Sequence, residues 1–177
     1  MSHAYLIAKE EFRDDTRLLA AVRQWGDRLH EVTRDAGDSF GGRSRGVDRR
    51  VLIAQGWAHW GNATGNRKAL ADAYRYHVHA LRSIGRNGRD RVWVNVFPKR
   101  RVYYANMTYG AAMSTAFALS RSGADDVYAM APGGGTLVEG AAWLWETLHR
   151  EQPPELFNSC GVALKIDPLR GVIRVQI

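Results

Sequence analysis

Residues 99–106 bring together side chains that could move a proton beside a bound anion. Three cations stand directly before two phenols and an amide: Lys99, Arg100, Arg101, Tyr103, Tyr104 and Asn106. A Tyr hydroxyl titrates at about pH 10, and neighbouring cations favour its phenolate, which makes it a usable proton acceptor or donor. The same cations could neutralise a substrate carboxylate and acidify the adjacent C–H bond. The alternative interpretation is a basic turn followed by aromatic core residues.

The histidines and the one close pair of acids give weaker indications of chemistry. His77 and His79 lie two residues apart in a predicted helix, so their side chains point about 200° apart and cannot easily chelate one metal ion. We interpret them, with His59, as packing or surface residues, and we predict no metal and no other cofactor. Asp125 and Asp126 are adjacent and next to a turn, which favours a solvated helix cap over a pair of glycosidase acids.

The periodicity of apolar residues predicts that these groups are carried by helices. Leu18, Val22, Trp25, Leu29 and Val32 are three or four residues apart, and they form one stripe of an amphipathic helix over residues 16–33. Further helices are predicted over residues 48–61, 70–84, 103–119 and 137–148. The 103–119 helix is almost free of charge and should be buried on most sides. We therefore expect a mainly α domain of antiparallel helix pairs.

Other segments have the composition of loops or strands. Residues 35–46 contain four glycines and are predicted to form a loop. Residues 92–97 are β-branched and aromatic, and they are predicted to be a short extended piece. Two β-type runs, 162–166 and 172–177, surround a Pro/Gly turn and predict a short C-terminal β-hairpin.

The stretch Gly133–Gly135 could suggest a phosphate-binding loop, because backbone amides in such loops bind anions. It lacks the Lys-Ser/Thr that follows in a P-loop, and no predicted strand leads into it. Thr136 and Glu139, directly after it, have the spacing of a capping box at the start of a helix. These observations favour a plain helix-entry loop.

Length and composition indicate one basic domain covering residues 1–177. The net charge is +7, and 21 of the 25 basic residues are Arg, whose planar forks bind carboxylate or phosphate through two hydrogen bonds. Arg-rich composition is also common where coding is GC-rich. Cys160 is the sole cysteine, which excludes an intrachain disulfide and a Cys-based zinc site. The sequence contains neither an export signal nor an apolar run long enough to cross a membrane, so no membrane partner is expected.

Several short motifs, in this order, resemble the second half of the alginate lyase family, the poly(mannuronate) lyases. Ala4–Ile7 and the Trp25 helix resemble the helix pair before the family's active site. The stretches that resemble its "ATGDRALL", "QIxxDG", "RALxYHN" and "NGVDLY" motifs are Ala63–Leu70, Ile84–Gly88, Arg101–Asn106 and Ser122–Tyr128. The resemblance implies an (α/α) toroid, β-elimination of a uronate polymer without a metal, and a periplasmic or secreted location.

The resemblance also implies roles for individual residues. Tyr104 would transfer the proton, and Arg100 or Arg101 would steady the carboxylate as catalytic groups. The residues expected to bind the substrate are Arg49, Tyr103, Asn106, Lys99 and His59. The sequence departs from the family where its Asn-His pair should fall, because Asp48 and Arg49 stand there, and Ala105 replaces the His of "YHN". Arg49 could still pair with a carboxylate.

The resemblance therefore predicts an acidic-polysaccharide lyase on a partial toroid. A complete toroid needs roughly twice as many helix pairs, so an apolar edge would stay open unless self-association, a second chain or the C-terminal hairpin covers it. The missing Asn-His pair favours an alternative, a non-catalytic carbohydrate-binding or assembly protein on the same scaffold. A nucleic-acid binder is a third interpretation, because Arg interleaved with Trp and Tyr also suits phosphate backbones and bases, but no helix-turn-helix, RNP or zinc pattern supports it.

Overall fold

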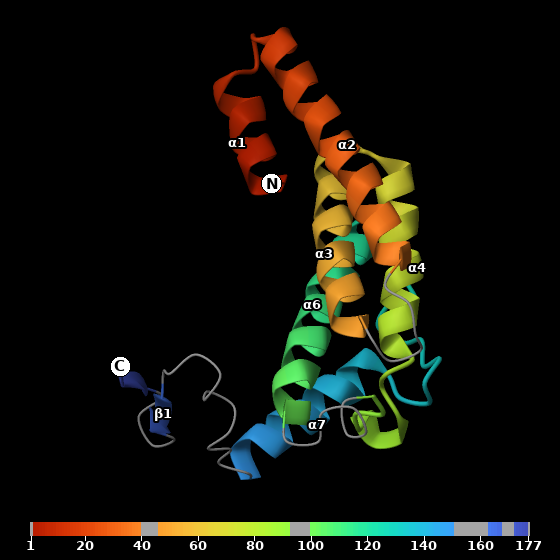
Figure 1. Cartoon of the computed structure of the whole chain (residues 1–177), viewed down its shortest axis with the longest axis vertical. Coiled ribbons are helices and arrows are strands. Elements are labelled where there is room, and N and C mark those ends of the chain that lie inside the picture. The colour runs from red at the N-terminus through yellow and green to blue at the C-terminus, as the bar shows by residue number, and fades with distance from the viewer. Residues whose placement is uncertain (1, 40–45, 93–99, 151–162, 168–171, 177) are drawn as a thin grey trace.

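The computed structural model describes residues 2–39, 46–92, 100–150, 163–167 and 172–176. These residues are mainly helical, which confirms the predicted fold class at that level. The α-helices among them are α1 (Ser2–Glu11), α2 (Thr16–Ser39), α3 (Val47–Thr64), α4 (Arg67–Leu81), α6 (Arg101–Arg121) and α7 (Leu137–Arg150) (Figure 1). A 3-10 turn, η1 (Arg86–Gly88), follows α4, and two strands, β1 (Ala163–Asp167) and β2 (Val172–Gln176), follow α7.

The antiparallel hairpin of α3 and α4 forms the centre of the fold. Gly65 ends α3 in the left-handed conformation with φ 73°, and its N–H donates to the Gly61 carbonyl at 2.8 Å. Gly65 has no Cβ to oppose this conformation. Asn66 then caps α4, because its side chain accepts a hydrogen bond from the Ala69 N–H at 3.0 Å. The turn is tighter than predicted, since α3 continues through Thr64.

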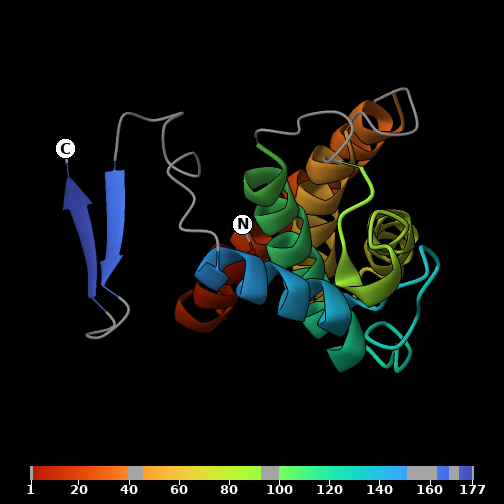
Figure 2. The same ribbon diagram turned by 90° about the horizontal axis from the view of Figure 1, so that it is seen from below.

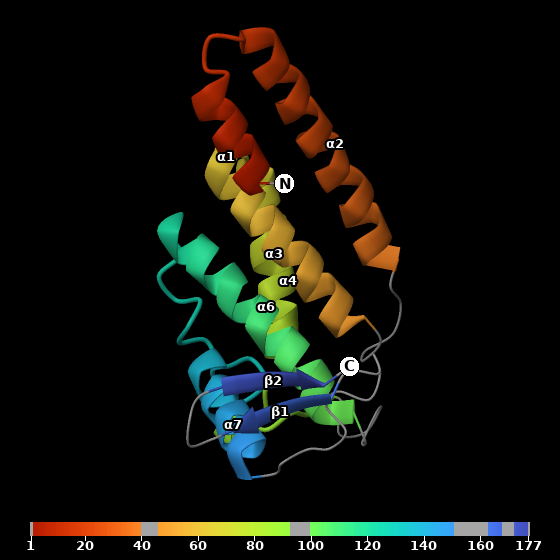
Figure 3. The ribbon, with the colours of Figure 1, turned by 90° about the vertical axis from the view of Figure 1, so that its left-hand side faces the viewer.

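Helix α6 runs parallel to α3 and lies along it (Figure 1 and Figure 3). His59 Nε2 and Ser114 Oγ are 2.9 Å apart, and the Asn62 side chain donates to the Ala118 carbonyl at 2.8 Å. These partners are 55 and 56 residues apart, so the two helices keep one register. Small buried residues of the two helices permit the close approach: Ala54, Ala58, Ala105, Ala112 and Ala116. The prediction that the 103–119 helix is buried on most sides is confirmed.

Helix α7 begins with the capping box that the sequence predicts. The Thr136 N–H donates to Glu139 Oε2 at 2.7 Å, and the Glu139 N–H donates to Thr136 Oγ1 at 3.2 Å. The two bonds from Thr136 to this carboxylate lower the pKa of Glu139. A Cβ at Gly135 would overlap the carbonyl of Gly85 in the turn after α4. The glycine-rich stretch is therefore a closely packed helix entry.

Helix α2 differs from the prediction in its length. It extends to Ser39, so residues 35–39 of the predicted loop are helical, while residues 40–45 lie outside the described part of the chain. The glycine-based prediction was wrong over 35–39 because Gly37 alone does not end a helix, and its cost against Ala is only about 1 kcal/mol.

Most of the apolar stripe of α2 lies outside the face that packs on the other helices, although Val22 packs against the core. Leu18, Trp25 and Val32 are 38%, 59% and 51% exposed. The packed face carries Gly26 and His30 instead, and a Cβ at Gly26 would overlap the Trp60 ring. Because Gly26 has no side chain, α2 can approach α3 closely at this point. The close approach does not depend on an apolar side chain of α2.

Polar bonds hold this face of α2 in place. Asp27 Oδ1 accepts from the Trp60 ring N–H at 2.9 Å, and Thr33 Oγ1 accepts from the Trp57 ring N–H at 2.9 Å. His30 Nε2 lies 3.0 Å from Asp72 Oδ2 of α4. Because 27, 30 and 33 are three residues apart, they share one side of the helix. The docking of α2 therefore depends on polar groups that an apolar pattern does not reveal.

The remaining elements lie toward the C-terminus. Helix α4 ends at Leu81, three residues before the predicted end, and Ile84 forms an isolated bridge with Asp90. The predicted extended piece at 92–97 falls almost entirely outside the described residues. Strands β1 and β2 pair antiparallel, with Lys165 opposite Arg174 (Figure 2). Among the described residues, every helix is too short or too polar to cross a lipid bilayer.

Candidate functional site

The first turn of α6 carries the two tyrosines that the sequence analysis singled out. The helix follows Arg100, whose side chain is exposed and makes no capping bond to it. Tyr103 and Tyr104 are half-buried, and their rings meet edge to face with centroids 5.3 Å apart. Both rings also pack against the hydrophobic core. The two phenol rings are therefore fixed at the end of α6 and are not sealed in the interior.

The first turn of α3 brings Arg49 to the level of these tyrosines. The register of α3 against α6 pairs residues 55 or 56 apart, and Arg49 and Tyr104 are separated by that number of positions. Arg49 is exposed, like Arg100 at the neighbouring helix end. The parallel packing thus sets Arg49 of α3 at about the same height along the two helices as the tyrosine pair of α6. We call Arg49, Arg100, Tyr103 and Tyr104 the helix-end site.

The structure does not assign the other predicted site residues to the helix-end site. Asn106 lies on α6 and is exposed. Arg101 is the first residue of α6, but its side chain lies outside the described part, as does all of Lys99. His59 pairs with Ser114, which is about 15 Å along α6 from Tyr104 at 1.5 Å per residue. The structure therefore separates His59 from the helix-end site and gives it a partner between the two helices.

Tyr109, one and a half turns further along α6, shows what a purely structural tyrosine looks like in this fold. It is 2% exposed, and its hydroxyl donates to the Gly88 carbonyl at 3.4 Å. Burial, with Asp90 nearby, raises the pKa of Tyr109 far above its ordinary value. This hydroxyl cannot exchange protons with a substrate. The contrast favours Tyr103 and Tyr104 as the phenols of α6 that a ligand could reach.

A second cluster of cations lies on the α4 side of α3, and sequence reasoning did not find it. A cavity of about 430 Å³ opens there, and its polar lining residues are Arg50, Tyr74, Arg75, Tyr76, His79 and Arg82. We call it the basic pocket. The spacing of Arg75, His79 and Arg82, at i, i+4 and i+7, is a signal in the sequence that could have revealed it. Arg50 joins them only because α3 and α4 pair in the antiparallel hairpin.

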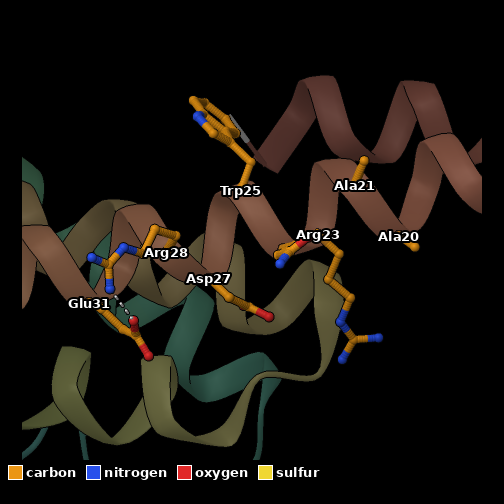
Figure 4. Close-up of a pocket in the computed structure, with 8 residues that line it drawn as sticks. Ala20, Ala21, Arg23, Trp25, Asp27, Arg28 and Glu31 are labelled. Atoms are coloured by element: carbon orange, nitrogen blue, oxygen red, sulfur yellow. Dashed lines mark hydrogen bonds and ion pairs between the residues drawn. The ribbon is translucent and has the colours of Figure 1, made fainter.

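A wider hollow of about 730 Å³ lies along α2 (Figure 4). Two of its lining residues are bonded, because Arg28 donates to Glu31 at 3.2 Å, and Trp25 points away from Asp27 on the opposite side of the helix. Its lining residues come from α2 alone. Its lining contains two arginines and two acids, whose opposite charges offset one another, so it offers no concentration of positive charge comparable with the other two clusters.

The described residues contain no group of three or more His, Cys, Asp or Glu side chains that could hold a metal ion. His77, which the sequence analysis interpreted as a packing or surface residue, is fully buried, and its Nε2 bonds the Val127 carbonyl at 3.0 Å. Burial lowers the pKa of His77, so it is held neutral. No known protein family, curated protein or solved structure matches the chain.

Proposed function

We propose that this chain binds an acidic polysaccharide, alginate or a related polyuronate, at the helix-end site and cleaves it by β-elimination. The observation that carries the proposal is that Arg49 on α3 and the half-buried tyrosine pair on α6 lie at the same height along the two parallel helices. Guanidinium groups pair with carboxylates, and aromatic rings offer flat apolar surface to a sugar. An anionic chain lying across both helix ends would meet these groups together.

The proposed reaction uses Tyr104 as the proton-transfer group. Its phenolate takes the proton from C5 of the uronate, and the electron pair forms the C4–C5 double bond as the C4–O bond breaks. The leaving oxygen keeps the bonding pair and takes the proton back from the phenol. Arg49 and Arg100, or Arg101, neutralise the carboxylate and so acidify the C5–H bond. No metal takes part in this scheme.

A second candidate function is non-catalytic binding of the same polymer. Asp48 and Arg49 occupy the positions where the resemblance to alginate lyases places an Asn-His pair. Asp48 adds a negative charge next to the carboxylate that must be stabilised, which opposes elimination but leaves the arginines able to hold the polymer. On this alternative the tyrosine pair serves only as a sugar platform.

We propose in addition that the helix pairs are part of an (α/α) toroid with an open edge. The parallel packing of α3 and α6, with α4 antiparallel to α3 and in contact with both, supports this arrangement. Exposed apolar side chains of α1, α2 and the turn between them support the existence of an edge that a second copy or another chain covers: Leu6, Ile7, Phe12, Leu18, Trp25 and Val32. Sedimentation of the purified chain, with Trp25→Lys as the comparison, tests this: a monomer at all concentrations contradicts it.

The catalytic proposal is tested by the absorbance of the conjugated double bond during incubation with alginate, polyglucuronate and hyaluronate. We expect product from at least one polymer and loss of at least 100-fold of the rate in Tyr104→Phe. Tyr128→Phe is the matched control, because Tyr128 is also half-buried but lies outside α6. Full activity of Tyr104→Phe removes the assigned role.

Binding assays separate the two candidate functions. Retention on immobilised alginate that Arg49→Gln weakens and Arg121→Gln does not, without any absorbance change, selects the non-catalytic function. Arg121 is an exposed arginine at the far end of α6, so the two variants lose the same charge. Salt-sensitive retention of DNA, with no binding of any uronate, contradicts both.

A further inference from the structure

The basic pocket has the composition of an anion site that is separate from the helix-end site. Three of its lining residues are arginines, Arg50 from α3 and Arg75 and Arg82 from α4, and none of its lining residues is acidic. Guanidinium groups keep their charge at every physiological pH. Three such charges around one cavity repel one another, and a bound anion relieves that repulsion.

Two of these guanidinium groups are held in position by neighbours. Arg50 Nη1 lies 3.1 Å from His79 Nε2. Arginine can only donate, so His79 accepts this bond through an unprotonated Nε2. Arg75 lies with its Cζ 4.9 Å from the centre of the Tyr76 ring, and its Nη2 is 3.4 Å from Asp72 Oδ1. Such anchors reduce the conformational entropy that a ligand would otherwise have to remove.

Burial and the charges of Arg50 and Arg82 lower the pKa of His79, in agreement with the neutral ring that the Arg50 bond requires. A neutral imidazole leaves the pocket three guanidinium charges, of which Asp72 offsets part at the Arg75 side. The hydroxyl of Tyr74, which lines the pocket, donates to Asp126 Oδ2 at 3.1 Å, so this carboxylate offsets positive charge on the Tyr74 side. The positive charge is therefore concentrated toward Arg50 and Arg82.

We propose that the basic pocket binds the ester of a tetrahedral oxyanion, a phosphate monoester or a sulfate ester, with the oxyanion among Arg50, Arg75 and Arg82. Three or more terminal oxygens match several guanidinium forks, whereas one carboxylate satisfies a single fork. The cavity is larger than the oxyanion and lies within the range of small-molecule sites, about 300–1,000 Å³. The half-buried Tyr74 ring supplies a flat wall for the organic part of the ligand.

Titration calorimetry of the full chain at fixed ionic strength tests the proposal. The probes are inorganic phosphate, glucose 6-phosphate, glucose 6-sulfate and glucuronate. We expect saturable binding of inorganic phosphate, tighter binding of one of the two glucose esters, and at least tenfold weaker binding of glucuronate. Preference between the two esters identifies the source of the oxyanion. Absence of saturable phosphate binding, or glucuronate binding as tightly as the esters, overturns the proposal.

A pair of double variants with equal charge locates the binding. Arg75→Gln with Arg82→Gln removes two exposed arginines of the pocket, and we expect it to weaken phosphate binding at least tenfold. Arg86→Gln with Arg121→Gln removes two exposed arginines elsewhere, and we expect less than a twofold change. The single variant Arg82→Gln, with an expected loss of at least threefold, makes the same test if the pocket double variant unfolds. Equal losses in the two double variants mean non-specific attraction and refute the site.

Discussion

Replacement of Asp27 by Ala should destabilise the protein more than any other single truncation of a partly exposed side chain on α2. Asp27 Oδ1 accepts from the Trp60 ring N–H at 2.9 Å and from the Asn66 side chain at 2.7 Å. Trp60 is fully buried, and Asn66 is the residue that caps α4. One carboxylate oxygen therefore connects α2 to α3 and to the start of α4.

The size of the effect follows from these two bonds. A hydrogen bond to a charged group contributes about 1.5–3 kcal/mol, and a buried donor left unpaired costs about 1–3 kcal/mol. The Trp60 N–H has no access to water, while Asn66 is half-buried and can bond water in the variant. We expect Asp27→Ala to lower the free energy of unfolding by about 2–4 kcal/mol. Urea unfolding followed by circular dichroism measures it.

Glu31→Ala is the matched control, one turn further along α2. Glu31 forms an ion pair with Arg28 at 3.2 Å, and both side chains are exposed. Exposed pairs of this kind contribute about 0–1 kcal/mol. In the Asp27→Ala background, Trp60→Phe should cost at least about 1 kcal/mol less than in the wild type, because the unpaired ring N–H is removed with it. Equal stabilities of Asp27→Ala and Glu31→Ala would refute the docking of α2 through polar bonds.

Two further predictions concern α7 and the basic pocket. Thr136→Ala removes the cap of α7 and should lower the free energy of unfolding by about 1 kcal/mol. Thermal unfolding measures this loss, and Thr16→Ala, which replaces a Thr in the first turn of α2, is the control. The lowered pKa of His79 means that, at and below its ordinary pKa of about 6.5, the folded protein binds fewer protons than the unfolded chain. Stability should thus be full above pH 6.5 and decline as the pH falls toward the folded-state pKa. The slope of urea midpoint against pH should be shallower in His79→Gln, and an unchanged slope contradicts the assignment.

Local patterns predicted the helices and their caps, because the interactions that form them join residues close in sequence. Thr136 and Glu139 are three residues apart, and the capping box they form could be read directly. The end of α2 was placed too early, since Gly37 weakens a helix without stopping it.

Contacts between distant segments could not be predicted in the same way. The face of α2 that packs is defined by Gly26 and by bonds to Trp57, Trp60 and Asp72, which lie 24 to 42 positions from their partners. An apolar stripe gives no information about such bonds, and Trp25 and Val32 of the stripe are exposed. The basic pocket could be predicted only in part for the same reason. The spacing of Arg75, His79 and Arg82 is visible in the sequence, but Arg50 joins them only when α3 and α4 pair as a hairpin.

The two proposed sites share the first turn of α3, which predicts how strongly they influence each other. Arg49 belongs to the helix-end site and Arg50 to the basic pocket, and adjacent side chains on a helix point about 100° apart, which separates their charged ends by roughly 10 Å. Two unit charges at that distance in water interact by about 0.4 kcal/mol, and salt at 0.1 M screens most of it. Saturating glucose 6-phosphate should therefore change the affinity for alginate by less than about twofold, relative to sodium chloride at the same ionic strength. A change of tenfold or more would mean that Arg49 and Arg50 hold one anion between them, and that the helix-end site and the basic pocket form a single groove around the start of α3.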